Sequence, residues 1–420
     1  MSDSLTLMAV GDVILGDPED PKALFNNILP ELRKADILFG QCENNYSLRG
    51  SIIPGARGHM SYHPRNVEAL EFCGFDVMSL CSNNSLHSGY AALLDTMKLL
   101  DERGIRYVGV GENQRESRKY VVQEHGDTRI AFLAYSPASD PTYIATPNRC
   151  GNNPMRIYSV FNDLERDFPG ASPEVLTFPD RQHVRWMKED IAKAREEADI
   201  VVVSFHWGVP FVPYLCADYE SELGQTAIDA GADLILGHHQ HVIKGIEIYK
   251  GKVIFHGMNH FAVSIQFKTQ NAHVDEAAYL GKKYGKYFLA QERIDDERVS
   301  NPFAADANYT MIVEAKVVGK KVTDIFFLPC VLDFQSQIFP TRPGDGKFEA
   351  CLDYTKAATL QAGFDTEFAV EGHRVRLITD ASSPVVSSPG ARQCSSARPL
   401  TPQCSAGSST DKEREHVRAP

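Results

Sequence analysis

Five short polar segments carry the side chains with which this chain could do chemistry, and each of them follows an apolar run. Carboxylate, carboxamide and imidazole groups recur in them: Asp12, Glu43, Asn83, His206, and the pair His239 and His241. A carboxylate can bridge two divalent ions, neutral imidazoles complete each ligand set, and an amide oxygen fills a remaining position. These residue types predict a centre of two divalent ions. Nitrogen and oxygen ligands without thiolate favour Mn, Fe or Zn there.

The segment Gly237-His238-His239-Gln240-His241 is the strongest single signal. Alternate residues of an extended backbone project the same way, so His239 and His241 are expected to point toward one site. The other motifs also have ordinary explanations when each is taken alone. A Gly-Asp pair after a strand is commonly a turn, His206 could be a satisfied polar residue, and Glu43 could be solvated. The coincidence of all five segments at strand ends favours a site.

The elements that would position these residues alternate between apolar runs and amphipathic stretches. Expected strands cover residues 5–10, 36–41, 75–80, 106–109, 129–135, 199–206, 232–237 and 252–256. Expected helices cover residues 21–34, 64–73, 89–103, 181–197 and 218–230. This alternation is typical of an α/β fold with parallel strands. The carboxyl ends of such strands meet at one edge of the sheet, where ligands bind.

The remaining segments differ in composition. Residues 136–180 and 207–217 are rich in Pro, Gly and Asn and are expected to form long loops. We expect a lid or excursion over 268–308, a closing hairpin over 309–328, a last helix over 348–364 and a disordered tail over 381–420. The expected domains are a main domain of residues 1–335, a C-terminal extension of residues 336–380 packed on it, and the tail.

Composition narrows the classes of function. The 420 residues carry a formal net charge of −12, which argues against nucleic acid or an anionic membrane as partner. No apolar stretch reaches the ~18–20 residues of a membrane span. The N-terminus enters its first expected strand without the basic region of a signal peptide, and the nine cysteines contain no C-x-x-C pair. We therefore expect a cytoplasmic protein without a disulfide framework.

Several blocks of the sequence resemble the capsule-synthesis CapA (poly-γ-glutamate synthesis) family. They occur in the family's order over about residues 5–265: GDVILG, CENN, SLCSNNSLHSGYAALLDTMKLLDERGI, VSFHWGVPFVP, AIDAGADLILGHHQHVIKGIEIYKGKVIF and MNHF. That family is similar in fold to calcineurin-like metallophosphoesterases. The resemblance implies a four-layer α/β/β/α sandwich, a dinuclear divalent-metal site and a hydrolase-like mechanism.

The resemblance also assigns roles to individual positions. The residues that match its metal ligands are Asp12, Glu43, Asn83, His206, His239 and His241, with Glu43 as the bridging acid. Asn84 and Trp207 are expected to contact substrate, and His238 is expected either to support the ligands from beside them or to contact substrate.

Three positions depart from the family pattern. Asn84 stands where the NNH motif has a histidine, His87 stands where an aspartate is usual, and His260 stands where asparagine is common. An amide cannot shuttle protons near neutral pH, whereas an imidazole can. His87 and His260 are therefore the candidates for the catalytic proton donor. Ser82 or Asn84 could instead cap the helix expected to start near Ser88.

The function expected from these features is metal-dependent hydrolysis of a phosphoester or of an amide or ester bond in a small molecule or short polymer. Two alternatives stay open at this point. One is an accessory role in poly-γ-glutamate or capsule biosynthesis, and the other is a metal-stabilised binding module without turnover. Because one fold hosts many functions, the class of substrate rests on the resemblance alone.

Overall fold

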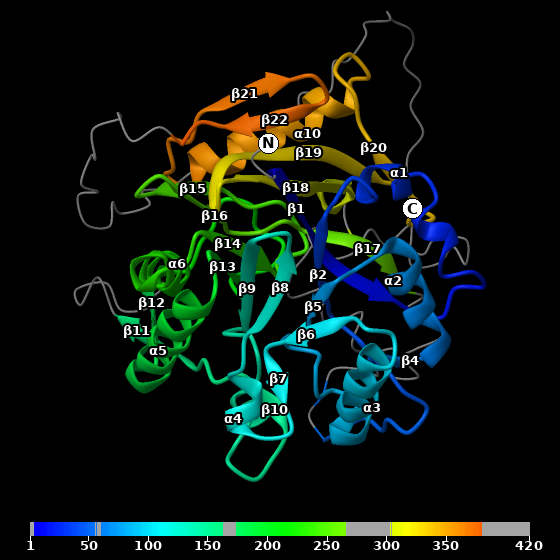
Figure 1. The fold of residues 1–420 in the computed structure, drawn as a ribbon, viewed down its shortest axis with the longest axis vertical. Coiled ribbons are helices and arrows are strands. Elements are labelled where there is room, and N and C mark those ends of the chain that lie inside the picture. The colour runs from blue at the N-terminus through cyan, green and yellow to red at the C-terminus, as the bar shows by residue number, and fades with distance from the viewer. Residues whose placement is uncertain are drawn as a thin grey trace, which may run out of the picture. The chain divides into compact units, whose positions relative to one another are not determined.

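In the computed structural model, residues 4–54, 56, 60–162, 174–265, 303 and 305–379 are described. Two large sheets dominate this part of the chain (Figure 1). The ten-stranded sheet contains β1 (Ser4–Leu15), β2 (Ile37–Cys42), β5 (Val77–Ser79), β6 (Arg106–Val108), β17 (His260–Ser264), β18 (Tyr309–Val318), β19 (Lys321–Leu332), β20 (Ile338–Pro340), β21 (Phe368–Glu371) and β22 (Arg374–Leu377). The six-stranded sheet contains β8 (Val121–His125), β9 (Thr128–Tyr135), β13 (Ile200–His206), β14 (Leu234–His238), β15 (Ile246–Tyr249) and β16 (Lys252–Phe255).

The smaller elements connect and cover these sheets. Three two-stranded sheets pair β3 (Asn45–Tyr46) with β4 (Ser61–Tyr62), β7 (Val110–Gly111) with β10 (Gly151–Asn152), and β11 (Ile157–Asn162) with β12 (Glu174–Pro179). The α-helices are α1 (Leu29–Leu32), α2 (Val67–Cys73), α3 (Gly89–Asp101), α4 (Gln114–Ser117), α5 (Arg181–Glu197), α6 (Asp218–Ala230) and α10 (Lys347–Gln361). Short 3₁₀ turns are η1 (Ala23–Phe25), η2 (Pro64–Asn66), η3 (Pro141–Tyr143) and η5 (Ala305–Asn308).

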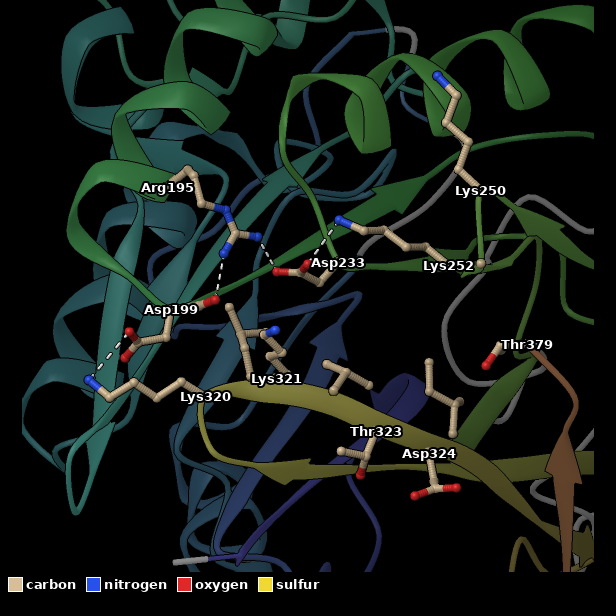
Figure 2. A pocket seen from close by; sticks show the side chains of 14 residues that line it. Arg195, Asp199, Asp233, Lys250, Lys252, Lys320, Lys321, Thr323, Asp324 and Thr379 are labelled. Carbon is tan, nitrogen blue, oxygen red and sulfur yellow. Dashed lines mark hydrogen bonds and ion pairs between the residues drawn. The ribbon is translucent and has the colours of Figure 1, made fainter. Parts of the chain in front are cut away.

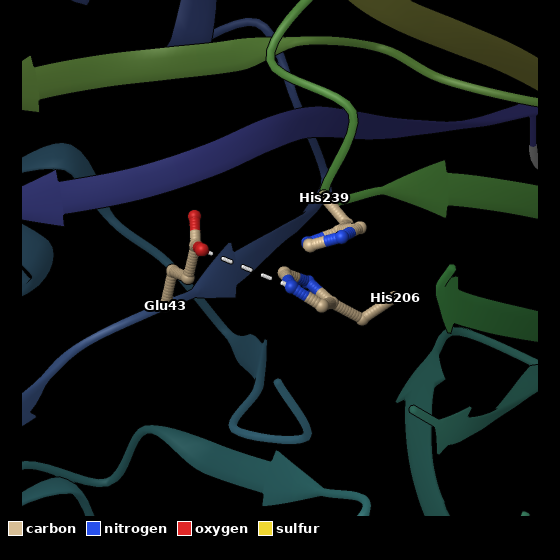
Figure 3. Close-up of side chains that lie close together, drawn as sticks. All are labelled: Glu43, His206 and His239. Atoms are coloured by element: carbon tan, nitrogen blue, oxygen red, sulfur yellow. Dashed lines mark ion pairs between the residues drawn. The ribbon is translucent and has the colours of Figure 1, made fainter. Parts of the chain in front are cut away.

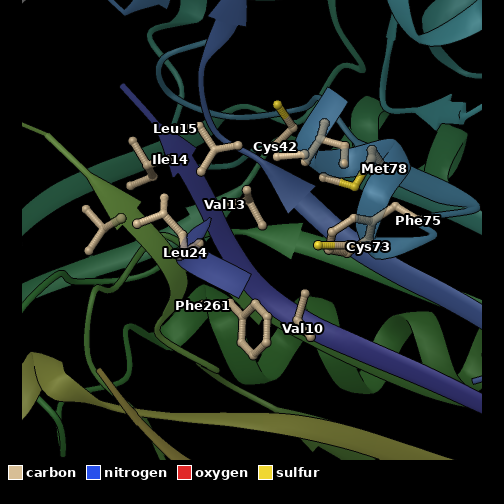
Figure 4. Close-up of a cluster of buried hydrophobic side chains, with 14 of the residues drawn as sticks. Val10, Val13, Ile14, Leu15, Leu24, Cys42, Cys73, Phe75, Met78 and Phe261 are labelled. Atoms are coloured by element: carbon tan, nitrogen blue, oxygen red, sulfur yellow. The ribbon is translucent and has the colours of Figure 1, made fainter. Parts of the chain in front are cut away.

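The alternation of side chains along the strands produces four layers. In β1, Leu5, Leu7 and Ala9 face the core between the two sheets, whereas Met8 and Val10 belong to the outer core that also contains side chains of α2 and α3. Figure 4 shows the outer core on that side, including Val10. The predicted four-layer α/β/β/α sandwich is confirmed.

The six-stranded sheet repeats this arrangement with its own pair of helices. In β13, Ile200 and Val202 face the core between the sheets, whereas Val201 and Val203 pack with α5 and α6. Strands covered on both faces are apolar almost throughout, which is why β13 reads as a continuous hydrophobic run.

Most predicted elements are present, with two corrections. The helix expected over 21–34 is only η1 and α1, because Pro30 lacks the amide hydrogen that a longer helix would need at that position. The loop expected over 136–180 contains the hairpin of β11 and β12, whose short β-prone runs are separated by a long connection. The predicted closing hairpin is confirmed by β18 and β19.

The C-terminal part joins the larger sheet. β22 pairs with β19, and α10 supplies Phe348 and Cys351 to the core between the sheets. The division into a main domain and an extension at residue 335 stays a prediction. The tail expected over 381–420 lies outside the described residues, as does most of the excursion expected over 268–308. None of the helices in the described ranges is long and apolar enough to cross a membrane.

Candidate metal centre

The predicted ligands converge at the edge where strands of both sheets end. The ten-stranded sheet contributes Asp12 in β1 and Glu43 directly after β2. The six-stranded sheet contributes His206 at the end of β13, with His239 and His241 following β14. The face-to-face packing of the sheets therefore brings carboxylates from one sheet to imidazoles from the other.

Asp12 lies in an irregular part of β1 rather than beyond the end of the strand, as the sequence had suggested. The register with β2 shifts between Ala9 and Asp12, and the register with β17 shifts directly after Asp12. Such bulges re-aim a side chain. Gly11 allows the close approach of the residue that precedes β17, because a Cβ atom there would lie 1.9 Å from the carbonyl oxygen of Asn259. The Asp12 amide donates to that same oxygen at 3.0 Å.

Glu43 belongs to both groups of potential ligands at this edge. One group is Glu43, His206 and His239, and the other is Asp12, Glu43 and His241. Within each group the candidate ligand atoms lie within 4.8 Å of one another. Oε1 of Glu43 is 3.8 Å from Nε2 of His206 and 3.8 Å from Nε2 of His241. One buried carboxylate thus stands between two sets of side chains.

Figure 3 shows the first group, with Glu43 from one sheet opposite His206 and His239. Asn83 completes this side, because its Oδ1 lies 2.6 Å from Nε2 of His206. The amide oxygen and the imidazole nitrogen therefore occupy the same small volume. Four of the six predicted ligands therefore lie on this side: Glu43, Asn83, His206 and His239.

Several buried polar atoms of the cluster have no hydrogen-bond partner in the described part of the chain, and this pattern fits the binding of divalent ions. Among the described residues no hydrogen bond reaches Oδ1 of Asp12, Oε2 of Glu43, or Nδ1 of His206 and His241, although all four atoms are buried. Buried polar atoms are normally paired, and such a concentration of unpaired oxygen and nitrogen atoms fits the binding of cations. The atoms left over are oxygen and nitrogen donors, which suit Mn, Fe or Zn.

The pKa shifts of Glu43 and His206 in the protein alone show that burial disfavours the charged form of both side chains. Burial, and then the neighbouring charge of Asp12, raise the pKa of Glu43 well above its usual value. Burial, and then the neighbouring imidazoles, hold the pKa of His206 well below its usual value. Bound cations reverse this preference for a protonated carboxyl and keep the imidazole neutral.

The backbone around the histidine-rich segment differs from the expected extended chain. His239 has φ of 92° and His241 has φ of 53°, so both lie in the left-handed region. Strained conformations of non-glycine residues concentrate at functional sites. The backbone amide of His239 donates to Oδ2 of Asp12 at 3.0 Å, and the ring of His241 packs against the rings of Phe211 and Phe303, which also contact each other. These contacts, rather than strand alternation, aim the two rings.

His238 and His260 flank Asp12. Nδ1 of His238 lies 3.3 Å from Oδ1 of Asp12, which places this fully buried residue beside the predicted ligands. His260 is paired with Asp12 across β1 and β17, and its ring lies 5.8 Å from that of His241. Burial, and then His241, hold the pKa of His260 well below its usual value.

Asn84 has a partner that the sequence did not suggest. Its amide nitrogen donates to Oε1 of Glu43 at 2.9 Å, so it holds the shared carboxylate. The backbone amide of Asn84 donates a hydrogen bond of 3.1 Å to the hydroxyl oxygen of Ser82, within a run of turns. Helix α3 begins at Gly89, and no side chain caps it at Ser88. The helix cap expected from Ser82 or Asn84 is therefore not formed.

Two further predicted residues lie beside the cluster rather than in it. The ring of His87 packs edge-on against Tyr143, with centroids 5.9 Å apart. Trp207 is fully buried, stacks on Phe205 and donates its indole hydrogen to the carbonyl of His256 at 2.8 Å. In this conformation Trp207 belongs to the core under α6, and contact with a substrate would require rearrangement.

A cavity of about 450 Å³ lies at the opposite edge, where β13, β14 and β16 begin (Figure 2). Its charged lining is tied into ion pairs, with Asp233 contacting both Arg195 and Lys252, and Lys320 lying 3.5 Å from Asp199. These pairs account for the polar character of the cavity. It contains none of the predicted ligands.

Two capsule or PGA biosynthesis proteins are similar in sequence to this chain. The chain is 28% identical over 279 residues to the capsule biosynthesis protein CapA of Bacillus anthracis, covering 62% of this chain and 60% of that protein. It is 26% identical over 268 residues to the PGA biosynthesis protein CapA of Bacillus subtilis, covering 62% and 63%. The match thus spans about three fifths of the length of these relatives.

Solved structures with a similar arrangement include a novel phosphatase from Mycoplasma pneumoniae, at a TM-score of 0.44, 16% identity and coverage of 79% of this chain and 95% of that one. Another is the calcineurin-like phosphoesterase YfkN from Bacillus subtilis, with a TM-score of 0.37 and 14% identity. That match covers 86% of this chain and 100% of the YfkN chain.

The family model described as "Bacterial capsule synthesis protein PGA_cap" matches residues 6–264. This range includes every predicted metal ligand and the two sheet edges that carry them. The chain belongs to the bacterial capsule synthesis protein PGA_cap family.

Proposed function

We propose that this chain is a metal-dependent hydrolase whose centre binds two divalent ions and acts on a phosphoester or on an amide or ester bond. The observation that carries the proposal is the shared position of Glu43 between two groups of ligands. Glu43, His206, His239 and Asn83 would hold one ion, and Asp12, Glu43 and His241 the other. When bound, such ions polarise a substrate oxygen and lower the pKa of a water to about 7.

The chain's own residues divide the remaining tasks. Asn84 fixes the Glu43 carboxylate, and His238 lies against Asp12. His87 or His260 would supply a proton to the leaving group, because the usual histidine of the NNH motif is Asn84. His260 is fully buried beside His241, whereas His87 borders the loop that contains Tyr143. Of the two, His87 has the easier route to exchange its proton with solvent.

A panel of substrates tests the proposal. The chain is loaded with Mn, Fe or Zn and offered phosphate monoesters, phosphate diesters and γ-glutamyl amides. Turnover of one class by the wild type, with loss of turnover in Glu43→Gln, supports hydrolysis. Absence of turnover by a chain that holds both ions would contradict it and would leave a binding module.

A second candidate is an accessory role in poly-γ-glutamate or capsule biosynthesis, favoured by the family and by the names of its relatives. Binding of a γ-linked glutamate oligomer, measured by calorimetry, would support that role if no hydrolysis accompanies it. Cytoplasmic location, and a small-molecule or short-polymer substrate rather than nucleic acid, complete the proposal. The exclusion of nucleic acid as a partner is consistent with the net charge of −12.

A further inference from the structure

A second group of potential metal ligands lies apart from the first, under the loop of residues 207–217. Sγ of Cys216, a carboxylate oxygen of Glu220 and a ring nitrogen of His256 lie within 4.8 Å of one another. Cys216 is near the end of the loop, Glu220 lies in the first turn of α6, and His256 follows β16. Glu220 and His256 are fully buried, and Cys216 is half-buried.

The ring of His256 is held in the way that metal-binding histidines usually are. Its Nε2 lies 2.9 Å from Oε2 of Glu247, and a carboxylate on one ring nitrogen orients the other toward a metal. Nδ1 is buried and has no hydrogen-bond partner within the described residues. The ring stacks on that of Trp207, with ring centroids 5.7 Å apart, and on that of Phe364, with ring centroids 4.9 Å apart. Of the two ring nitrogens, Nδ1 is therefore the one without a hydrogen-bond partner in the described ranges.

We propose that Cys216, Glu220 and His256 bind a single zinc ion, separate from the dinuclear centre. A thiolate, an imidazole and a carboxylate are the three ligand types that proteins use for zinc. A softer ligand set with sulfur disfavours the ions that prefer oxygen, such as Mn. With three protein ligands, water would occupy the fourth position. The half-buried Cys216 provides the side from which the ion can enter.

The charges around the cluster are compatible with a bound dication. Burial raises the pKa of the Cys216 thiol, so the metal-free thiol is neutral and zinc would displace its proton. The ammonium of the buried Lys244 donates to the carbonyl of Leu215. In the zinc form, the thiolate and the carboxylates of Glu220 and Glu247 balance the two charges of zinc and the one of Lys244.

The ion would link three segments of the chain. Oε1 of Glu220 accepts a hydrogen bond of 2.6 Å from the amide of Ala217, so α6 and the end of the loop are already joined. Zinc would add β16 through His256. The loop begins directly after His206, a ligand of the main centre. The zinc site would therefore fix the segment that connects the two metal-binding regions.

Cobalt substitution tests this site without any assay of activity. Cobalt bound to thiolate gives a charge-transfer absorption in the near ultraviolet that nitrogen and oxygen ligands do not give. The full chain is stripped, reloaded with Co²⁺ and compared with Cys216→Ser, Glu43→Gln and, as a thiol control, Cys150→Ser. We expect the band in the wild type, Glu43→Gln and Cys150→Ser, and its loss in Cys216→Ser.

Zinc content should agree with the spectra. Cys216→Ser should hold one zinc ion fewer per chain than the wild type, while Glu43→Gln keeps the thiolate-bound ion. Circular dichroism verifies that each variant is folded, and Cys216→Ala replaces Cys216→Ser if the serine variant is not. A wild type without the band, or a Cys216→Ser variant that retains it, would overturn the proposal. Neither result depends on hydrolysis.

Discussion

The side-chain amide of Asn84 donates a hydrogen bond of 2.9 Å to Oε1 of Glu43, the carboxylate shared by both groups of ligands. At this position the NNH motif of the family usually has a histidine. An amide can hold the carboxylate in place but cannot exchange a proton near neutral pH. In the proposed hydrolase, Asn84 could therefore position Glu43 but could not transfer a proton.

Removing this hydrogen bond should weaken the metal centre. We expect Asn84→Ala to lower metal affinity ~10–100-fold, the usual effect of losing a residue that orients a ligand. Competition with a chelator of known affinity measures the change. Asn113→Ala, which removes the cap of α4, serves as the control and should retain wild-type affinity. Equal affinities for wild type and Asn84→Ala would contradict this role.

If His87 supplies the proton that the usual histidine would have supplied, its loss should affect turnover alone. His87→Ala should keep both ions and lower turnover by the ~10²–10⁴-fold typical of a general acid. Asp12→Ala should instead lose metal and activity together. Metal analysis alongside single-substrate kinetics distinguishes the two cases. An unchanged turnover in His87→Ala would transfer the assignment to His260.

The close contact at Gly11 should couple stability to metal binding. In Gly11→Ala the new methyl group would meet the Asn259 carbonyl at 1.9 Å, so β1 and β17 must separate. We expect a loss of stability of ~1–3 kcal/mol, as for overpacking, together with loss of bound metal at Asp12. Urea unfolding and metal content measure both.

Gly74→Ala is the matched control for this variant. Gly74 has φ of 82° and no atom near the position of a Cβ, so alanine there adds backbone strain without a clash. It should cost ~1–2 kcal/mol and leave metal content unchanged. If Gly11→Ala behaves like Gly74→Ala, the close approach of β17 does not shape the site.

Acid sensitivity should arise in part from His183, which is remote from the metal ligands. Burial lowers the pKa of His183, and its Nδ1 accepts a hydrogen bond of 3.0 Å from the Arg156 amide. The unfolded chain, with a histidine pKa of about 6.5, then binds more protons than the folded chain. This contribution to stability is complete above about pH 6.5 and is lost as the pH falls toward the lowered pKa.

The variant His183→Gln tests that contribution. Glutamine keeps an acceptor but does not titrate, so the free energy of unfolding should fall less between pH 7.5 and pH 5 than in the wild type. Urea titrations at both pH values give the comparison. Parallel losses in the two proteins would mean that His183 does not contribute.

The sequence was sufficient to predict the layers and the elements that carry the predicted ligands. β13 reads as a buried strand because it is apolar throughout, and α5 keeps its predicted bounds of Arg181–Glu197 because Asp180 caps it. The convergence of the predicted ligands follows from the parallel strands, whose carboxyl ends meet at one edge.

Other features depend on contacts that no local pattern encodes. The bulge at Asp12 requires β17, which is more than two hundred residues away, to approach Gly11. The left-handed backbone of His239 and His241 is held by Asp12 and by two aromatic rings. The pairing of Asn84 with Glu43 joins two segments whose individual sequences suggest only a turn and a solvated acid.

The central claim is that Glu43 bridges two ions, and electron paramagnetic resonance of the Mn²⁺-loaded chain tests it most directly. Manganese avoids the thiolate of Cys216, so the spectrum would report on the oxygen and nitrogen ligands. We predict two manganese ions per chain with the multiline spectrum of an exchange-coupled pair, and loss of that coupling in Glu43→Gln. A wild-type chain that binds one manganese ion, or two ions without coupling, would contradict the claim.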